Sequence, residues 1–352
     1  DRLRSRGLGD VYKRQTSLRL SDNNLQKKSE NDMELKRYPL KMQPAYKGSL
    51  WGGDTLKRKF GKDSGLAVTA ESWELSTQKA GLSRIAQGPY EGMAFDEYIS
   101  KFPQAVSPQF SSLDKFPILV KFLDVEKPIS IQVHPSDENA GPGEEGKAEA
   151  WYIVSANPGA RIYYGLKEPI TKEQLKQHAL AGTLEQVVNQ APVQPGQVWY
   201  NHPGILHSLE GGALVAEVQQ NSDTTYRVYD FNRKDAQGNL RELHLEKAAE
   251  VIDYTPQQGA EKAIQSKKAG ANALSALFSC EYFKMKRLDV ETRIELCCKE
   301  ESFPCLLFLE GKGNILFAGE RFAFQAGDCY FLPAGLGEYE VEGACMALFA
   351  HI

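Results

Sequence analysis

The stretch Gly196–His207, GQVWYNHPGILH, decides how this chain folds, because its pattern returns 131 residues later in Gly327–Glu338, GDCYFLPAGLGE. The first and ninth residues of both copies are glycine, and the twelfth is His207 in the first copy and Glu338 in the second. Two glycines at this spacing are typical of a tight turn between antiparallel strands, where a positive φ or a close backbone approach is required. A repeated β unit of this kind indicates a double-sheet jelly roll, the cupin architecture, and predicts two similar barrels. Chance similarity is the alternative.

Short apolar runs and turn residues surround both copies, and they predict a mainly β chain. We expect strands over residues 116–122, 130–134, 150–154, 161–164, 197–200 and 213–219, and almost nothing but strand and turn over 278–352. Apolar residues at helical spacing predict helices over 94–106, interrupted near Pro103, over 170–189, broken at Gly182, and over 243–252. The expected fold class is therefore mainly β, with two cupin-like jelly-roll barrels and short helical insertions in the first.

Changes in composition divide the chain into a leader, two domains and a linker. Residues 1–32 contain eight Lys/Arg and five Asp/Glu without a sustained apolar period, and part of this segment resembles a translated sequencing adapter. We expect it to be a non-native or disordered leader and the natural protein to begin at Met33. The segment 256–270, PQQGAEKAIQSKKAG, has the composition of a linker. It separates a domain over 33–255, which carries the helical inserts, from a second β domain over 271–352.

The composition is that of a globular protein rather than of a nucleic-acid or membrane protein. The 352 residues are 41% hydrophobic and 25% charged, and the formal net charge is −4. A protein that binds the phosphate backbone of nucleic acid usually presents a basic face. No apolar run approaches the roughly 20 residues that a membrane helix needs. We therefore expect no nucleic-acid partner and no membrane association.

Cysteine usage predicts free thiols. All six cysteines lie in the last quarter of the chain, and none forms a C-x-x-C pair. Cys297 and Cys298 are adjacent, which suits a disulfide framework poorly. Free cysteines are commonly small buried hydrophobic residues, and they are usual in a reducing compartment. We therefore expect a cytoplasmic protein.

The segment Ser130–Pro135, SIQVHP, carries the strongest local signal for chemistry. In a strand, residues two apart share a face, so Gln132 and His134 are predicted to point together into the barrel. Glu149 begins the strand EAWYIV after a loop that can bring it back beside His134, and His207 closes the glycine turn on a following strand. Two imidazoles, one carboxylate and one amide oxygen would form a mixed N/O site for zinc or another divalent first-row metal. Each imidazole taken alone could instead belong to a histidine that is hydrogen-bonded in the core and binds no metal.

Two other segments lack the features of a further site. The second copy of the repeat has Glu338 in place of His207, and no Gln-x-His precedes it. We therefore expect the C-terminal domain to be metal-free and structural. The loop Gly141–Gly146, GPGEEG, matches G-x-G-x-x-G, but the dinucleotide fingerprint needs a helix after the glycines. Here a strand follows, and the two glutamates would repel a pyrophosphate.

Basic residues gather around the predicted ligand segments. Lys121 lies on the strand before SIQVHP, Lys147 is two residues from Glu149, and Arg227 lies twenty residues after His207. Ammonium and guanidinium groups are the usual partners of phosphates and carboxylates. Three of them beside one metal site favour an anionic substrate, although each alone is more often a solvated surface charge.

Several of these blocks resemble a known family. The run FPILVKFLDVEKPISIQVHP (Phe116–Pro135) looks like the signature stretch of the mannose-6-phosphate isomerases, and GKAEAWYIV, GILHSL and SDTTYRVYDFNRKDAQGNLRELH are similar to later blocks of the short bacterial cupin type. The resemblance is strong over about residues 38–254 and looser in the C-terminal domain. It implies a catalytic domain over 33–255 and an enzyme that interconverts mannose 6-phosphate and fructose 6-phosphate with one Zn²⁺ per chain.

The resemblance also implies roles for particular residues. It carries the metal-ligand role over to Gln132, His134, Glu149 and His207. It carries the catalytic role over to Arg227, and contact with the substrate or its phosphate over to Lys121, Ser130 and Lys147.

The reaction that the resemblance implies moves a proton between C1 and C2 through a cis-enediol, so no redox cofactor is required. The general base stays open among Lys147, a metal-bound water and a nearby carboxylate, provided that the group reaches the proton within about 3 Å. Two other functions are compatible with the same residues. Two histidines and one glutamate match the facial triad of a non-haem iron oxygenase, and a cupin can also be a non-enzymatic, metal-bearing sugar-phosphate binding protein. We expect a monomer or a homodimer.

Overall fold

The structure of the protein is a computed structural model that describes residues 34–108, 115–235, 237–257 and 263–352. The predicted leader and part of the predicted linker, residues 258–262, lie outside the described residues. Residues Arg37–Ile352 form one compact unit. In the part of the chain that the structure describes, no helix has the length and apolar character needed to cross a membrane.

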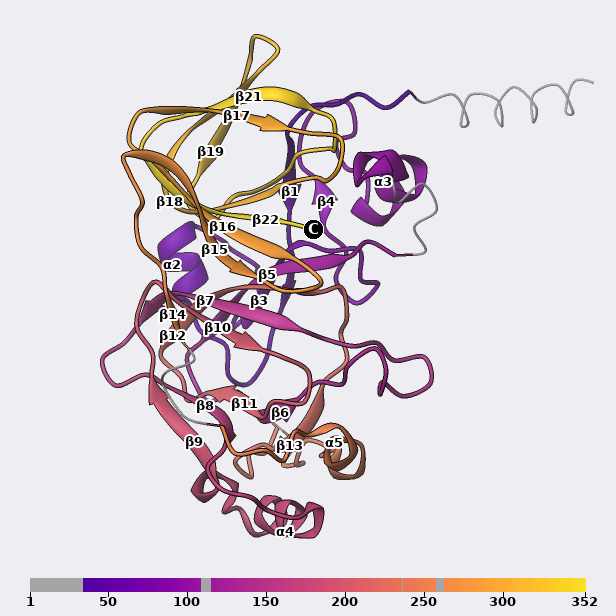
Figure 1. Ribbon diagram of the computed structural model, residues 1–352, viewed down its shortest axis with the longest axis vertical. Coiled ribbons are helices and arrows are strands. Elements are labelled where there is room, and N and C mark those ends of the chain that lie inside the picture. Colours follow the sequence, from indigo (N-terminus) through magenta and orange to yellow (C-terminus); the bar gives the residue numbers. More distant parts are fainter. Residues whose placement is uncertain (1–33, 109–114, 236, 258–262) are drawn as a thin grey trace, which may run out of the picture. The chain divides into compact units, whose positions relative to one another are not determined.

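Strands are the predominant secondary structure of the described chain, so the predicted mainly β class is confirmed (Figure 1). The strands are β1 (Leu40–Gln43), β2 (Ala45–Lys47), β3 (Glu71–Leu75), β4 (Arg84–Ile85), β5 (Ile118–Val125), β6 (Ile131–Val133), β7 (Glu149–Ala156), β8 (Arg161–Leu166), β9 (Val188–Pro192), β10 (Gln197–Asn201), β11 (His207–Leu209), β12 (Ala213–Gln220), β13 (Tyr226–Tyr229), β14 (Ile264–Gln265), β15 (Asn272–Ser279), β16 (Lys284–Val290), β17 (Arg293–Cys298), β18 (Cys305–Phe317), β19 (Glu320–Gln325), β20 (Cys329–Phe331), β21 (Gly337–Glu342) and β22 (Cys345–His351). The helices are α2 (Thr55–Phe60), α3 (Phe95–Lys101), α4 (Lys172–Ala181) and α5 (Leu245–Val251), with 3₁₀ turns η1 (Pro103–Ala105) and η3 (Leu184–Gln186).

Two sheets in the first part of the chain enclose a common apolar layer. A seven-stranded sheet has the order β14-β10-β7-β12-β5-β3-β2, and a five-stranded sheet has the order β13-β6-β11-β8-β9. Trp151 and Trp199 from the larger sheet and Ile162 and Leu209 from the smaller one belong to one buried cluster. Each such side chain contributes about 1.5–3 kcal/mol when it leaves water. This layer holds the two sheets face to face, and the inward polar residues of both sheets meet beside it.

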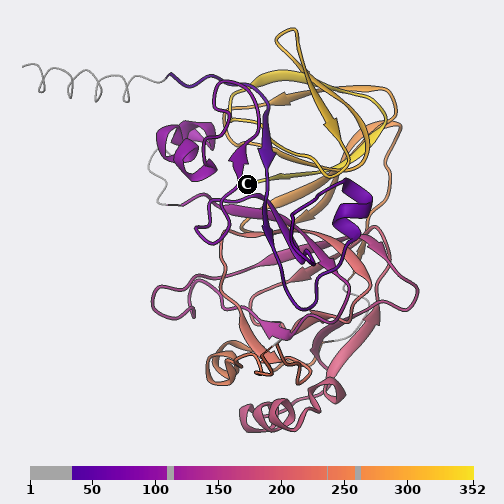
Figure 2. The same ribbon diagram turned by 180° about the vertical axis from the view of Figure 1, so that it is seen from behind.

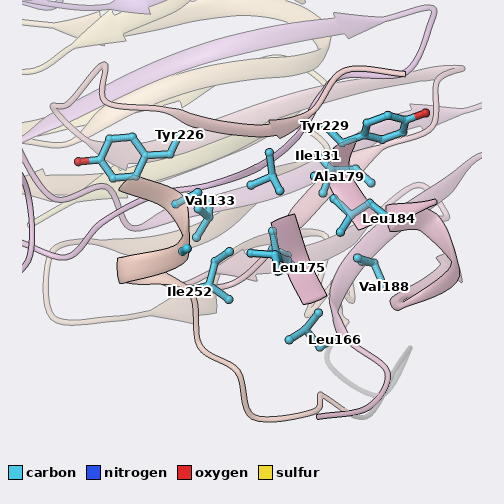
Figure 3. Packing of buried hydrophobic residues seen from close by; sticks show 14 of the residues in the cluster. Ile131, Val133, Leu166, Leu175, Ala179, Leu184, Val188, Tyr226, Tyr229 and Ile252 are labelled. Atoms are coloured by element: carbon cyan, nitrogen blue, oxygen red, sulfur yellow. The ribbon is translucent and has the colours of Figure 1, made fainter. Parts of the chain in front are cut away.

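Helices α4 and α5 cover the outer face of the five-stranded sheet. Figure 3 shows Ile131 and Val133 of β6 packed with Leu175 and Ala179 of α4. Helix α4 begins with a capping box at Thr171 and ends where predicted, before a glycine in the left-handed region. Because side chains alternate along a strand, burial of Ile131 and Val133 under the helices turns the residue between them to the inner face.

The C-terminal strands form a ten-stranded sheet around a separate apolar cluster (Figure 1). Its main path is β15-β16-β22-β18-β20-β1-β4, with β17, β19 and β21 attached beside it. No helix occurs over 278–352, a segment that the structure describes in full, as the sequence predicted. Figure 2 shows β1, at the N-terminal end of the colour scale, beside the strands at the other end, and Leu40 pairs with Phe331.

The glycine repeat corresponds to a repeated turn conformation. Gly196 precedes β10 with φ 84°, and Gly204 lies between β10 and β11 with φ 89°. Gly327 precedes β20 with φ 93°, and Gly335 lies between β20 and β21 with φ 73°. All four positions require the left-handed region, which explains why glycine recurs there. The arrangement as two barrels stays a prediction.

The six predicted strands and three predicted helices all overlap observed elements, but strands β2, β3, β4, β9 and β13 were not predicted, and three further features of the fold were missed. Helix α2 has only six residues, too few for a clear apolar period. Strand β14 lies inside the predicted linker and extends the seven-stranded sheet by pairing with β10. Strand β1, inside the segment predicted as the first domain, pairs with β20 of the C-terminal sheet.

All six cysteines are free thiols, as predicted. Cys298, Cys305, Cys329 and Cys345 are buried, whereas Cys297 is exposed. The Cys305 and Cys329 sulfurs lie 3.4 Å apart on neighbouring strands. Four of the six cysteines therefore behave as the small buried residues that the sequence analysis expected.

A buried ion pair connects Lys62, in the turn that follows α2, to Glu74 of β3, and it allows a test of the fold. Lys62 is 9% exposed and Glu74 is fully buried, and their Nζ and Oε1 atoms lie 2.8 Å apart. Removal of the amine would leave a buried carboxylate without its cation. We expect Lys62→Met to lower the free energy of unfolding by about 3–5 kcal/mol, measured by urea denaturation.

The double variant Lys62→Met/Glu74→Leu should recover most of this loss, because apolar replacement of a whole buried pair is often neutral or stabilising. Lys57→Met serves as the control, since it breaks an exposed pair with Asp63 and should cost less than about 1 kcal/mol. A double variant that is no more stable than Lys62→Met would show that the orphaned charge is not the cause.

Candidate active site

Three inward residues of the five-stranded sheet form one row across neighbouring strands. Gln132 of β6 pairs directly with His207 of β11 on one side and with Arg227 of β13 on the other. Directly paired residues of antiparallel strands project from the same face. His134, two residues after Gln132, follows the end of β6 and is 1% exposed. The predicted convergence of Gln132, His134 and His207 is therefore present.

The seven-stranded sheet supplies the facing carboxylate. Glu149, the first residue of β7, is fully buried and pairs with Asn201 of β10. The Asn201 amide donates to Glu149 Oε1 over 3.0 Å and so fixes the orientation of the carboxylate. The carboxylate thus faces the two imidazoles from the opposite sheet.

The ligand atoms of His134, Glu149 and His207 lie within 4.8 Å of one another. His207 Nε2 is 3.0 Å from Glu149 Oε1, and His134 Nε2 is 3.4 Å from Glu149 Oε2. Tetrahedral ligands about 2 Å from a zinc ion are separated by roughly 3.3 Å. The spacing of these donors therefore fits a single small divalent ion.

Backbone carbonyls orient both imidazoles for this role. His134 Nδ1 lies 2.8 Å from the Thr224 carbonyl, and His207 Nδ1 lies 2.9 Å from the Ile205 carbonyl. A ring that donates from Nδ1 presents the lone pair of Nε2, which is the arrangement found around bound metals. Burial and the nearby Lys147 ammonium lower the pKa of His134 to about 3, so this ring is neutral at physiological pH.

Lys147 supplies positive charge at the same point. Its Nζ lies 2.7 Å from Glu149 Oε2 and 3.2 Å from His134 Nε2. Burial raises the pKa of Glu149, but Lys147 and the two histidines outweigh it and hold that pKa well below its usual value. No described residue gives Glu149 Oε2 a well-aligned hydrogen bond. The donors of His134, Glu149 and His207 therefore converge beside the Lys147 ammonium, and their spacing fits the metal that the sequence predicts.

Gln132 adjoins this group with its amide. Its Nε2 lies 3.5 Å from His207 Nε2, and its Oε1 accepts from the Ser130 hydroxyl over 3.4 Å. The side chain thus contacts His207 and Ser130 and also lines the cavity.

A cavity of about 410 Å³ opens in front of the ligands, a volume within the range of small-molecule sites. Its walls include Gln132 and all four residues predicted to contact substrate or act in catalysis, which are Lys121, Ser130, Lys147 and Arg227. Five basic residues line it, Lys47, Lys121, Lys147, Arg227 and Arg241, against three acidic ones, Glu71, Glu217 and Asp223. The excess of positive charge favours an anionic ligand.

Glu71 and Glu217 are site residues that the sequence analysis did not assign. Lys121 Nζ lies 3.2 Å from Glu71 and 3.4 Å from Glu217, over the ring of Trp73. Burial lowers the pKa of Lys121, but the two carboxylates outweigh it and raise that pKa. Burial and the charge of Glu149 raise the pKa of Glu217 to about 8. Lys121 is therefore a permanent cation, held in place from both sides.

Arg227 is anchored by the segment that leads into α5. Its Nη1 donates to the Glu242 carbonyl over 2.8 Å, and its backbone N–H donates to His244 Nδ1 over 3.0 Å. Arg227 Nε is buried without a hydrogen-bond acceptor among the described residues. Burial and the neighbouring Arg241 lower the pKa of Arg227. The guanidinium thus lines the cavity with donor capacity left for a ligand.

The second copy of the repeat lacks this constellation. Glu338, the counterpart of His207, is exposed on β21 and pairs with Cys297. In the part of the chain that the structure describes, His134, Glu149 and His207 are the group of three that could hold a metal ion. The site can therefore bind a divalent ion, hold an anionic ligand in front of it and exchange protons through Lys147 or Glu217.

Comparisons with known proteins cover both parts of the chain. The model of the phosphomannose isomerase type I catalytic domain matches residues 40–178, and that of the mannose-6-phosphate isomerase cupin domain matches residues 273–352. The chain is 34% identical over 317 residues to mannose-6-phosphate isomerase ManA of Bacillus subtilis (strain 168), over 89% of this chain and 99% of that protein. It is also 34% identical to mannose-6-phosphate isomerase of Streptococcus mutans serotype c (strain ATCC 700610 / UA159), over 89% and 98%.

The fold agrees with these relatives. The crystal structure of mannose 6-phosphate isomerase from Bacillus subtilis is similar with a TM-score of 0.83 and 33% identity, over 90% of this chain and 100% of that chain. The resemblance found in the sequence is therefore confirmed, and the C-terminal segment is a cupin domain. The chain belongs to the type I phosphomannose (mannose-6-phosphate) isomerase family.

Proposed function

We propose that this protein is a zinc-dependent aldose–ketose isomerase that interconverts mannose 6-phosphate and fructose 6-phosphate through a cis-enediol. The observation that carries the proposal is the convergence of His134, Glu149 and His207 beside a cavity with an excess of positive charge. The family of the chain and the names of its relatives supply the substrate.

His134, Glu149 and His207 would hold the ion, with the Gln132 amide as a fourth ligand. A bound divalent ion would act as a Lewis acid that polarises the substrate carbonyl and so acidifies the adjacent C–H bond. Zinc suits this donor set, because it accepts imidazole nitrogen and carboxylate oxygen in one site. Both imidazoles are already oriented, so binding would need no rearrangement of their hydrogen bonds to Thr224 and Ile205.

Lys121 and Arg227 would bind the anionic groups of the substrate. Both line the cavity, and Lys121 keeps its charge because Glu71 and Glu217 stabilise the protonated form. Arg227 has a buried Nε without an acceptor among the described residues, so a substrate oxygen would satisfy it. Guanidinium hydrogen bonds to an oxyanion are among the strong charge-assisted ones.

Lys147 and Glu217 are the groups that we expect to exchange the proton between C1 and C2. Both line the cavity beside the predicted ligands, and Lys147 Nζ lies 3.8 Å from Glu217 Oε1. A general base must come within about 3 Å of the proton that it removes. Because the pKa of Glu217 is about 8, the ionised fraction of this carboxyl can accept the proton while the Lys147 ammonium beside it stabilises the charge.

Removal of the metal should abolish the reaction. We expect conversion of mannose 6-phosphate to fructose 6-phosphate, followed in a coupled assay, to stop after chelation and to return when about one Zn²⁺ per chain is added back. The zinc content of each sample is measured in parallel.

The same samples discriminate between the proposed function and its rivals. Undiminished turnover after the ion has been stripped would contradict a metal-dependent isomerase. A fully loaded sample that binds mannose 6-phosphate without converting it would indicate a binding protein. Oxygen consumption with bound iron would indicate an oxygenase.

A further inference from the structure

The glycine-rich loop Gly141–Gly146 connects two of the predicted metal ligands, since it lies between His134 and Glu149. Its glycines serve the conformation of the loop rather than a nucleotide. A Cβ on Gly141 would lie 2.5 Å from Glu144 Oε2, and a Cβ on Gly146 would lie 2.4 Å from the Asp137 nitrogen. The Glu144 carboxylate thus lies against Gly141, and the Asp137 backbone lies against Gly146.

The Glu144 carboxylate bridges two other elements. Its Oε2 accepts from the Tyr226 hydroxyl of β13 over 2.5 Å, and its Oε1 accepts from Lys247 Nζ of α5 over 2.7 Å. Lys247 Nζ also lies 5.6 Å from the centre of the Tyr226 ring. We call the group formed by Glu144, Tyr226 and Lys247 the clasp. The clasp connects the loop Gly141–Gly146, called the ligand loop below, to strand β13 and to helix α5.

Both partners of Glu144 are linked to Arg227. Tyr226 is its neighbour on β13, and Lys247 lies three residues after His244, which contacts Arg227. His244 exchanges two hydrogen bonds with Arg227, since it accepts the Arg227 N–H at Nδ1 over 3.0 Å and donates its own N–H to the Arg227 carbonyl over 2.8 Å. A displacement of Glu144 would therefore act on Arg227 from both sides.

We propose that the clasp positions Arg227 relative to the loop that connects the predicted ligands His134 and Glu149, which makes Glu144 a positioning residue for the reaction. The inference rests on the proposed isomerase function. Glu144 does not line the cavity of Lys121 and Arg227, so it acts through Arg227 rather than on the substrate. A misplacement of about 1 Å at a reacting centre can cost up to 10²-fold in rate.

The clasp is partly exposed to solvent, so its loss should leave the fold intact. The side chains of Glu144 and Lys247 are 27% and 57% exposed, and exposed ion pairs contribute little to stability. The loop also keeps other anchors, because Ser222 Oγ donates to the Glu145 carbonyl and Thr224 Oγ1 accepts from the Glu145 N–H. Loss of the clasp should therefore change geometry more than stability.

Steady-state kinetics of the zinc-loaded full chain test the proposal in three variants. These are Glu144→Gln, Lys247→Met and the charge exchange Glu144→Lys/Lys247→Glu. We expect each single variant to lower kcat for mannose 6-phosphate about 5–20-fold, with KM and zinc content within twofold of wild type. The charge exchange should restore kcat to within about threefold, because it rebuilds the ion pair. Amide hydrogen exchange over residues 242–247 should speed up in the single variants.

Glu246→Gln is the matched control. It breaks the exposed pair of Glu246 with Lys176, which ties α5 to α4 and not to the ligand loop. It should keep wild-type kcat. Wild-type kcat in both single clasp variants would overturn the proposal, as would a loss of kcat that accompanies loss of zinc or of thermal stability. An inactive zinc-loaded wild type would instead reject the proposed function itself.

Discussion

Replacement of His207 by alanine is expected to remove the bound metal and the isomerase activity together. The variant loses one of the two imidazoles whose Nε2 atoms approach Glu149, and no other histidine among the described residues lies in this group. The remaining donors would hold a zinc ion far more weakly, because zinc is usually bound by Cys, His, Asp or Glu and only His134 and Glu149 of these types would remain. We expect kcat/KM to fall at least about 10³-fold and zinc content after dialysis to fall below a tenth of the wild-type value.

His202→Ala is the matched control for this experiment. His202 lies in the same turn, five residues before His207, and its Nδ1 faces the Pro203 carbonyl rather than Glu149. It should retain zinc and activity. Full zinc content in His207→Ala would show that the ion is held elsewhere, and full activity in a metal-free His207→Ala would contradict the proposed mechanism. His134→Ala should behave like His207→Ala, because its Nε2 approaches the other oxygen of the same carboxylate.

The convergence of Gln132, His134 and His207 could be predicted from sequence because it depends on short-range rules. Gln132 and His134 share a face by the period of two along a strand, and Ile131 and Val133 are buried on the other face. His207 was found through the glycine repeat, whose turns are now seen in the same conformation. What the sequence could not supply is the pairing of β6 with β11 and β13, because register between distant strands is set by tertiary packing.

Two cavity residues, Lys121 and Glu217, carry a sequence signal that the sequence analysis did not use, namely a charged residue inside an apolar strand. Lys121 lies within the apolar run ILVKFLDV, and Glu217 lies within ALVAEV. A charged residue in the middle of a buried strand must find a partner, because burial of an unpaired charge is very costly. Applied to both strands, this rule predicts that Lys121 and Glu217 meet, and they are directly paired residues of β5 and β12.

The elements missed in the fold share a different cause. Strands β1 and β14 are short, and they are strands only because each extends a sheet formed by distant residues, β20 in one case and β10 in the other. Nothing local distinguishes Ile264–Gln265 from the polar segment around it. Likewise the loop Gly141–Gly146 could be excluded as a nucleotide motif, but its link from Glu144 to Lys247, 103 residues away, required coordinates.

Replacement of Arg227 by alanine is expected to separate catalysis from metal binding. Arg227 lines the cavity beside Gln132, and its side chain donates to the Glu242 carbonyl rather than to His134, Glu149 or His207. We therefore expect zinc content to stay at the wild-type value while kcat falls about 10²–10³-fold, the usual cost of removing one donor that stabilises developing negative charge. Arg227→Lys should recover only part of this loss, because an ammonium keeps the charge without the planar donor fork.

Arg84→Ala is the matched control, because Arg84 also donates from Nη1 to a backbone carbonyl, that of Gly92, over 2.9 Å, and lies on β4 away from the cavity. It should keep wild-type kcat. A fall in kcat that is seen only in Arg227→Ala is then not a general effect of losing an arginine–carbonyl hydrogen bond. The decisive comparison is between kcat and zinc content in Arg227→Ala. A fall in both would make Arg227 a support of the metal site, and wild-type kcat would remove it from the mechanism. A fall in kcat alone would leave charge stabilisation by the guanidinium as the explanation, because the ion and its ligands would then be unchanged.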